Sequence, residues 1–399
     1  MTLVSEQSGA TPFIPLCVPE FRGNEWSYVK ACLDTGWVSS VGSYVDRFEA
    51  AMAARIGARR AVATVNGTSA LHVALRVAGV ETDDEVVVST LTFIAPANAV
   101  RYRGAWPVFM DAEPKFWQMD MAKLAAFLAE GCSFSGGVLR NRTTGRLVKA
   151  LLPVHILGHP VDMDPLLELA RRYQLAVVED ASEALGATYQ GRPVGSHGDI
   201  AAFSFNGNKI ITTGGGGMIT TNNEAWANKA KYLTTQAKDD PLEYCHHEIG
   251  YNYRLTNLAA ALGVAQLEEL DEYVAVKRRI AQRYIEALGE VSGLTCMAEA
   301  PWAESTSWMF TVRLDAAVFG MSSRALLQHL QQQGIQTRPL WEPMHLSKSQ
   351  TGAMAWQMGV ADELYADCLS LPCSVGLTEV QQERVITALR AATKTDRKV

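Results

Sequence analysis

The sequence predicts an α/β protein, with a large domain built on a mostly parallel sheet and a smaller α+β domain at the carboxyl end. Between about residues 60 and 220, short apolar runs alternate with helical patterns, as they do where helices connect parallel strands. The apolar runs are nearly continuous, which is typical of strands buried on both faces. After about residue 255, the alternation gives way to one long helical pattern and a mixed tail.

Each element is predicted from its local pattern. The strands of the large domain are predicted over residues 61–65, 85–88, 107–110, 150–154, 175–178 and 200–205, the helices between them over 69–78, 94–102, 121–129 and 165–173, and a glycine turn with one more strand over 214–221. The tail is predicted to contain a helix over 257–288, a strand over 310–314, a helix over 324–333, a strand over 335–340 and a last helix over 379–392. Thr378 and Gln381 have capping-box spacing for that last helix. Residues 131–145 show no clear pattern and are interpreted as an insertion.

These patterns place the large domain at residues 15–255 and the long helix with the small domain at 256–399. The net charge of −6, from 36 Lys and Arg against 42 Asp and Glu, argues against a nucleic-acid partner, which requires clustered positive charge. No apolar run is long enough to span a membrane, and the first thirteen residues do not resemble a secretory signal. The seven cysteines form no CxxC pair, so we expect free thiols and a cytoplasmic location.

Three segments carry candidate chemistry, and the first is Asn-Gly-Thr-Ser-Ala-Leu at residues 66–71. A strand ends there, and a helix begins after a small polar turn. Such a turn presents backbone N–H groups at the positive end of a helix, where a phosphate can bind. Taken alone, the same residues are equally compatible with simple helix capping.

The second segment ends an apolar strand with Glu179 and Asp180. α/β proteins place ligand-binding groups at such strand ends. A buried aspartate there could pair with a cationic ring nitrogen and make that ring a strong electron sink. Helix capping by Asp180 is the alternative interpretation.

The third segment places Lys209 just after a strand and before the four glycines at 214–217. A lone lysine is usually solvated, but these flanks indicate a backbone that approaches a ligand closely. A lysine in such a pocket can form a Schiff base with an aldehyde cofactor. Ser204, at the end of the same strand, could donate to a phosphate.

In this order, and together with Gly-Tyr-Asn-Tyr-Arg at 250–254, these segments resemble the pyridoxal-phosphate (PLP) dependent sugar aminotransferases of the DegT/DnrJ/EryC1/StrS type. The resemblance extends from about residue 15 to the last helix. It implies the fold type I architecture of PLP-dependent transferases, PLP as cofactor, and a homodimer with shared active sites. It also implies two catalytic residues, with Lys209 as the Schiff-base lysine and proton carrier and Asp180 as the partner of the pyridinium nitrogen.

The resemblance implies further cofactor contacts. Phe93 matches the aromatic residue that stacks on the ring, and Asn252 matches a phosphate contact from the other subunit. Glu183 stands near the ring hydroxyl, where relatives usually have glutamine, which is a departure from the family pattern. The remaining cofactor-binding candidates lie at the phosphate end and are Gly67, Thr68, Ser69 and Ser204.

Residues 18–26, 34–42, 90–96 and 212–217 look like the LegC subgroup. That resemblance implies transfer of the amino group of L-glutamate to C4 of a UDP-linked 4-keto-6-deoxy-N-acetylhexosamine. A branch that replaces the lysine by histidine is disfavoured by Lys209. The candidates for binding the nucleotide sugar are Trp37, Ser39, Arg254, Arg338, Trp341 and His345.

Other functions stay open at this point. A 3-keto nucleotide-sugar aminotransferase is the nearest alternative, followed by a non-catalytic PLP-binding protein. A nicotinamide dehydrogenase is disfavoured because residues 66–71 lack the GxGxxG pattern. A metal site is not expected, because nothing near His155 and His159 completes a ligand set.

Overall fold

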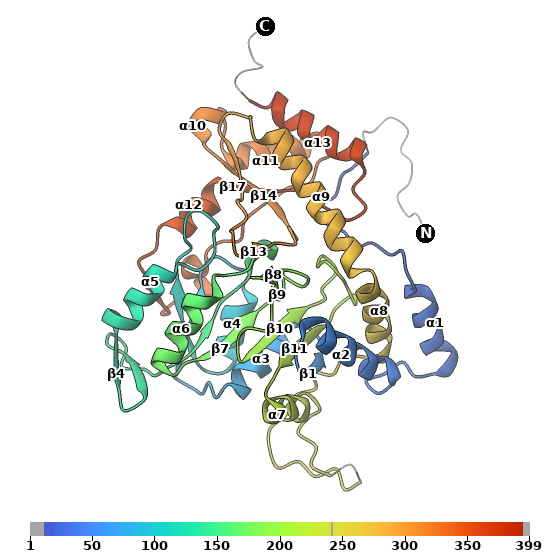
Figure 1. Cartoon of the computed structure of the whole chain (residues 1–399), viewed down its shortest axis with the longest axis vertical. Helices are drawn as coiled ribbons and strands as arrows, with labels where there is room; N and C mark the ends of the chain where they lie inside the picture. Colours follow the sequence, from blue (N-terminus) through green and yellow to red (C-terminus); the bar gives the residue numbers. More distant parts are fainter. Residues whose placement is uncertain (1–11, 241, 394–399) are drawn as a thin grey trace.

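The computed structural model describes residues 12–240 and 242–393. The larger, lower part of the molecule in Figure 1 contains an eight-stranded sheet, and the smaller upper part contains a four-stranded sheet. Helix α9 (Leu270–Leu288) runs between the two parts. The expectation that the chain starts without a secretory signal concerns residues 1–13, nearly all of which lie outside the described residues.

The large sheet confirms the predicted mostly parallel arrangement. All its neighbouring strands are parallel except for β11, which is antiparallel to both β1 and β10. In spatial order, the strands are β1 (Arg60–Thr64), β11 (Gly217–Thr221), β10 (Ile200–Ser204), β7 (Ala176–Asp180), β6 (Val148–Leu152), β2 (Glu85–Ser89), β3 (Trp106–Met110) and β16 (Met354–Trp356).

Helices cover both faces of this sheet, which explains why its strands are apolar on both sides. Side chains of α3 (Gly67–Val77), α4 (Ala95–Tyr102) and α7 (Glu224–Thr234) pack on one face. The other face is covered by α5 (Met121–Ala126) and α6 (Met163–Tyr173) at one end and by α2 (Ser43–Ile56) and α8 (Asn257–Glu268) at the other. Helix α1 (Glu25–Thr35) packs against α8.

The sequence analysis missed several elements of this large part. Helices α1, α2 and α7 were not predicted, and neither was β16, a three-residue strand that returns from the carboxyl-terminal region and pairs with β3. Residues 131–145 contain a hairpin of β4 (Cys132–Ser135) and β5 (Val138–Asn141). A further small sheet consists of β8 (Thr188–Tyr189), β9 (Arg192–Pro193) and β13 (Ala303–Glu304).

The long helix predicted over 257–288 is wrong as one continuous element. It is broken at Glu269, whose φ of −96° and ψ of −1° end α8 before α9 begins. Thr256 caps α8 by accepting from the N–H of Ala259. The break changes the direction of the chain between the two sheets (Figure 1).

The small sheet is antiparallel, with the order β12 (Leu294–Cys296), β14 (Phe310–Leu314), β17 (Cys368–Leu371), β15 (Arg338–Pro339). The strand predicted over 335–340 is reduced to two residues, because Ile335 instead bridges Ile14 near the amino end. Strand β17 was not predicted. The helices of this region are α10 (Ala316–Phe319), α11 (Ser323–Gln332), α12 (Val360–Asp367) and α13 (Glu379–Ala391), and α13 has the predicted capping box.

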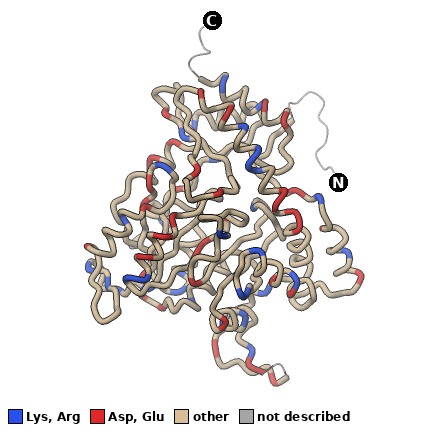
Figure 2. The backbone as a smooth tube through the Cα atoms, viewed as in Figure 1, with Lys and Arg blue, Asp and Glu red and all other residues tan. Residues whose placement is uncertain are grey.

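Charged residues of both signs are intermixed along the chain in both parts of the molecule (Figure 2). Within the part of the chain that the structure describes, no helix is long and apolar enough to cross a membrane. The boundaries of the two domains stay a prediction.

Candidate active site

A cavity of about 330 Å³ opens where the carboxyl ends of β7 and β10 meet the amino end of α3. This edge of a parallel sheet is where α/β proteins bind ligands. Most of the predicted cofactor-binding residues line it. They are Gly67, Thr68, Phe93, Asp180, Glu183, Ser204 and Lys209, joined by Trp341 from the list of sugar-binding candidates.

Lys209 occupies the turn that follows β10, and its backbone N–H donates to the Asn206 carbonyl at 3.0 Å. Its Nζ lies 3.6 Å from Glu183 Oε1 and 4.0 Å from the centre of the Trp308 ring. The side chain is 13% exposed, so the amine is directed into the cavity while remaining reachable from it. These contacts fix the position of the one lysine that lines this cavity.

Asp180 is the last residue of β7 and is buried. Its Oδ1 accepts from the backbone N–H of Ser182 at 3.0 Å. Burial raises the pKa of this carboxyl group, while the positive charge of Lys209 acts in the opposite direction. A buried carboxylate of this kind is stabilised by a cationic partner, as a protonated ring nitrogen would be.

Glu183 is also buried, and its two carboxylate oxygens have different partners. Oε2 accepts from the Leu157 N–H at 2.8 Å, and Oε1 faces Lys209. Burial raises the pKa of Glu183, and the nearby ammonium of Lys209 lowers it. Leu157 adopts a left-handed φ of 60°, so the donor that orients Glu183 comes from an unusual backbone conformation.

The amino end of α3 forms an anion cradle against β10. A Cβ atom on Gly67 would lie 2.7 Å from Ser204 Cβ, so only glycine lets the helix start so close to that strand. The first N–H groups of a helix lack intrahelical partners and, with the helix dipole, attract a phosphate. Ser69 is buried and does not line the cavity, and its N–H donates to Asn66 Oδ1 at 2.7 Å.

Aromatic residues from both parts of the molecule flank the cavity. Phe93 follows β2 and is 51% exposed, so its ring is free to contact a ligand. The rings of Trp308 and Trp341 are stacked, with centroids 6.3 Å apart and planes at 5°. The sequence analysis missed Trp308, whose Nε1 donates to the Asn208 carbonyl at 2.7 Å across 100 residues of chain. No local pattern in the sequence could have indicated that contact.

Seven of the predicted residues do not line this cavity: Ser69, described above, and Trp37, Ser39, Asn252, Arg254, Arg338 and His345. Trp37 and Ser39 lie beside the start of α8. The Trp37 carbonyl accepts from Asn257 Nδ2 at 2.7 Å, and the Ser39 carbonyl accepts from the Asn257 backbone N–H at 2.6 Å. Arg254 lines a separate cavity of about 120 Å³. Asn252 is exposed and forms an isolated bridge with Thr235.

Arg338 and His345 also lie outside the lining of the cavity. Arg338 is exposed, and its Nη1 donates to the Thr337 carbonyl at 2.9 Å. The His345 ring is held between Thr90 Oγ1, 2.8 Å from Nδ1, and Asp362 Oδ1, 3.1 Å from Nε2. Both ring nitrogens of His345 therefore already have partners.

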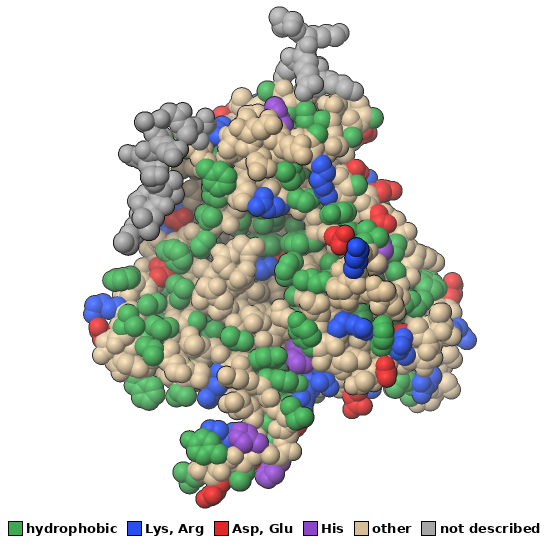
Figure 3. Space-filling model, turned by 180° about the vertical axis from the view of Figure 1, so that it is seen from behind, with side chains coloured by type: hydrophobic (Ala, Val, Ile, Leu, Met, Phe, Trp, Pro, Cys, Tyr) green, Lys and Arg blue, Asp and Glu red, His purple; other side chains and the backbone are tan. Residues whose placement is uncertain are grey.

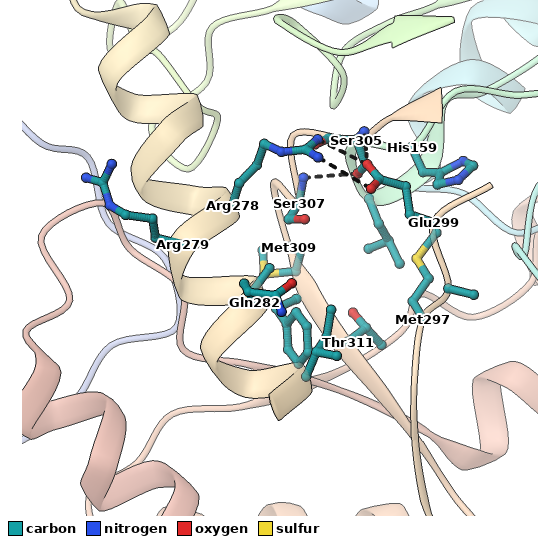
Figure 4. A pocket seen from close by; sticks show the side chains of 15 residues that line it. His159, Arg278, Arg279, Gln282, Met297, Glu299, Ser305, Ser307, Met309 and Thr311 are labelled. Carbon is teal, nitrogen blue, oxygen red and sulfur yellow. Dashed lines mark hydrogen bonds and ion pairs between the residues drawn. The ribbon is translucent and has the colours of Figure 1, made fainter. Parts of the chain in front are cut away.

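A second cavity of about 330 Å³ lies against α9 and is shown in Figure 4. Its charged groups are already paired, since Arg278 Nη1 lies 3.0 Å from Glu299 Oε1 and donates to the Ser305 carbonyl at 2.6 Å. None of the predicted site residues lines it. The cavity at Lys209 is therefore the candidate active site.

A model of the DegT/DnrJ/EryC1/StrS aminotransferase family matches residues 19–390. The chain belongs to this family. The aminotransferase is 43% identical to a GDP-perosamine synthase of Caulobacter vibrioides, over 95% of this chain and 98% of the relative. It is 38% identical to EpsN of Bacillus subtilis, a putative PLP-dependent aminotransferase, over 94% and 95% of the two chains. The solved structure of DesV from S. venezuelae superposes with a TM-score of 0.82 at 31% identity, covering 94% and 95%.

The family match establishes a PLP-dependent sugar aminotransferase acting on a nucleotide sugar. The cavity fits PLP on three independent features. The glycine cradle at α3 suits its phosphate, Asp180 suits its ring nitrogen, and Lys209 suits its aldehyde. PLP, when bound, supplies the electron sink for amino-group transfer.

Proposed function

We propose that this aminotransferase transfers the amino group of L-glutamate to C4 of a GDP-linked 4-keto-6-deoxyhexose, producing a GDP-linked amino sugar of the perosamine type. The relative named GDP-perosamine synthase carries this proposal, because it aligns with nearly the whole chain at 43% identity. Perosamine is 4-amino-4,6-dideoxymannose, so transamination that produces it consumes a ketone at C4. The proposal keeps the predicted C4 position but changes the predicted substrate from a UDP-linked N-acetylhexosamine to a GDP-linked hexose without the acetamido group.

The catalytic roles proposed for the site follow from its contacts. Lys209, once its amine is free and neutral, accepts a proton at Nζ and returns it on the other side of the transfer. Asp180, ionised, holds the positive charge of the ring nitrogen throughout the reaction. Glu183 lies within 3.6 Å of Lys209 and keeps that amine directed into the cavity. Ser204 and the α3 end hold the phosphate, and Phe93 covers the ring.

Arg338 and Trp341 are proposed to contact the nucleotide sugar; Trp341 lines the cavity and is held in place by stacking on the buried Trp308. A guanidinium is suited to a diphosphate, because its planar donors match two phosphate oxygens at once. His345 is proposed to orient the segment between Trp341 and His345, because its ring contacts Thr90 and Asp362.

A UDP-linked 4-keto-6-deoxy-N-acetylhexosamine is the second candidate substrate, supported by the LegC-like residues 18–26 and 34–42. The two candidates differ in the base and at C2, where one sugar carries a hydroxyl and the other an acetamido group. A site built for one of them must leave polar groups unpaired with the other, which gives strong discrimination.

The direct test uses the PLP-loaded enzyme and L-glutamate in three separate reactions. The nucleotide sugar is GDP-4-keto-6-deoxymannose in the first, the UDP-linked ketone in the second and a 3-keto nucleotide sugar in the third. Mass spectrometry of the nucleotide sugars and an assay for 2-oxoglutarate then report the transfer. The proposal predicts the highest kcat/KM with the GDP-linked ketone. Preference for the UDP-linked ketone would refute the choice of nucleotide, and preference for the 3-keto sugar would refute the C4 position.

We further propose that the enzyme is a homodimer in which Asn252 completes the partner's site. Residues 235–240 and 242–250 project below α7 in Figure 1 and form a lobe in Figure 3. It exposes Leu242 at 86%, Tyr244 at 67% and Ile249 at 78%, which is the composition of a surface that a partner covers. Asn252 follows this segment and does not line the Lys209 cavity of its own chain.

A mixed dimer tests this arrangement. Subunits carrying Lys209→Ala are combined with subunits carrying Asn252→Ala, and mixed dimers are isolated by two affinity tags. If the sites are shared, one site of each mixed dimer has both native residues, and activity returns to about half that of the native dimer. Activity no higher than the average of the two parent variants would show that Asn252 does not act across the dimer.

A further inference from the structure

Two thiols and a buried lysine amine lie close together beside the turn that carries Lys209. Lys277 of α9 is 2% exposed, and its Nζ lies 3.5 Å from Cys17 Sγ and 3.6 Å from Cys373 Sγ. Cys373 is 1% exposed, whereas Cys17 is partly exposed. Neither cysteine nor Lys277 has a role in the proposed transamination, and the two thiols lie 356 residues apart in sequence.

A buried ammonium is costly unless a negative charge accompanies it. Apart from the two sulfurs, Lys277 Nζ donates to the Trp308 carbonyl at 2.8 Å. One thiolate would complete this environment. Hydrogen bonding by Cys373 and the positive charges of Lys277 and Lys209 lower the pKa of the Cys17 thiol, and the pKa of Cys373 is raised. A thiolate is the form of cysteine that oxidants attack.

The backbones that carry the two cysteines run side by side. The Cys373 N–H donates to the Leu16 carbonyl at 2.8 Å, and the Val18 N–H donates to Ser374 Oγ at 3.0 Å. Cys17 and Cys373 therefore lie on adjacent backbones, with their two thiols in hydrogen-bonding contact.

We propose that Cys17 and Cys373 form an oxidation site, a thiol pair that a peroxide converts to a disulfide beside the catalytic lysine. The Cys17 thiolate attacks the peroxide, takes one oxygen as a sulfenic acid and releases hydroxide or an alkoxide. The Cys373 sulfur then attacks Cys17 Sγ, the S–O bond breaks, the S–S bond forms and water leaves. Two electrons pass from the two thiols to the peroxide. Lys277 stabilises the initial thiolate.

The disulfide would reach the active site through two carbonyl groups. Cys17 Sγ lies 3.4 Å from the carbonyl of Asn208, the residue before Lys209, and Cys373 Sγ lies 3.5 Å from the carbonyl of Trp308. A disulfide sulfur carries no hydrogen, so the Trp308 carbonyl loses its Cys373 donor, and the Cys17 sulfur beside the Asn208 carbonyl changes from a thiolate to a neutral sulfur. Lys277 loses its anionic partner at the same time. Oxidation is therefore expected to disturb the Asn208–Lys209 turn and lower activity.

The test uses the full-length, PLP-loaded enzyme. Hydrogen peroxide is added in increasing amounts, the protein is unfolded in guanidinium chloride so that N-ethylmaleimide reaches every remaining thiol, and the digest is analysed by mass spectrometry. The proposal predicts a linked peptide pair containing residues 17 and 373, lighter by the two thiol hydrogens and separated by dithiothreitol. Cys17→Ser abolishes this product, and Cys245→Ser, which removes an exposed thiol elsewhere, retains it.

The proposal is overturned if Cys17 and Cys373 of the native enzyme both carry maleimide after treatment with peroxide. This result does not depend on the folding of any variant. The link to Lys209 has its own readout, because activity should fall with disulfide formation, return with dithiothreitol, and be protected in Cys17→Ser. Full disulfide formation with unchanged activity would refute that link. Peptide masses do not depend on the sugar, so failure of the proposed substrate would leave the disulfide result interpretable.

Discussion

Replacing Gly67 with alanine tests the anion cradle where the structure is most restrictive. The new methyl group would lie 2.7 Å from Ser204 Cβ, 3.2 Å from Ser204 Oγ and 3.3 Å from Ser204 Cα. Carbon atoms in ordinary contact are about 3.5–4.0 Å apart, so α3 and β10 must separate by roughly 1 Å. All three contacts are with the last residue of β10, which pairs with both β7 and β11, and this makes the separation costly.

Overpacking of this kind costs about 1–3 kcal/mol. If the cost falls on the cradle, the affinity for PLP drops by about 5- to 150-fold, since 1.4 kcal/mol corresponds to a factor of ten. The assay is a titration of the PLP-free protein, followed by visible absorbance, with thermal unfolding as a second readout. Gly359→Ala is the matched control, because a Cβ there has nothing within 4 Å.

A second variant distinguishes packing from chemistry. Ser204→Gly removes the Cβ atom that the Gly67→Ala methyl group would hit. The double variant should therefore regain thermal stability while still binding PLP weakly, because the Ser204 hydroxyl is gone. If Gly67→Ala binds PLP as tightly as the native protein at unchanged Tm, the close approach of α3 to β10 does not form the phosphate site.

Three further perturbations have defined outcomes. Trp308→Phe removes the hydrogen bond from Nε1 to the Asn208 carbonyl, which contributes about 1–1.5 kcal/mol, and should lower kcat/KM by about tenfold. An unchanged kcat/KM would show that this bond does not position Lys209. Glu183→Gln should change how the Tm of the PLP-free protein depends on pH. Folding raises the pKa of Glu183, so protonation of this carboxyl group stabilises the folded state at low pH, and that stabilisation is lost as the pH rises from about 4.3 through the folded pKa. The Tm of the native protein should therefore fall relative to that of the variant over this interval. Parallel Tm profiles for the two proteins would contradict this. Arg338→Ala should raise KM for the nucleotide sugar by about tenfold with little change in the reaction with glutamate alone, and an equal effect on both would exclude a role confined to the sugar.

Local patterns were sufficient for the parts of the fold that depend on neighbouring residues. The strands around Asp180 and Ser204 are continuous apolar runs, and both lie within about two residues of their predicted ends. The motifs containing Gly67, Asp180 and Lys209 were predicted separately, and the structure brings them to one cavity because the carboxyl ends of parallel strands share an edge.

Long-range contacts account for what the sequence could not show. Strand β16 has three residues, and its pairing with β3 spans more than 240 positions. The apolar periodicity continues across Glu269, so the break between α8 and α9 leaves no sign in the pattern. Trp308 reaches the Lys209 turn only because the small sheet packs above the large one.

We expect Lys209 to hold PLP covalently. The enzyme is loaded with PLP, reduced with borohydride to make the attachment permanent, digested and analysed by mass spectrometry. The peptide that contains Lys209 should carry a pyridoxyl phosphate group, and the same peptide of a Lys209→Ala variant should carry none. A native protein labelled at another lysine, such as the buried Lys277, or not labelled at all, would contradict it.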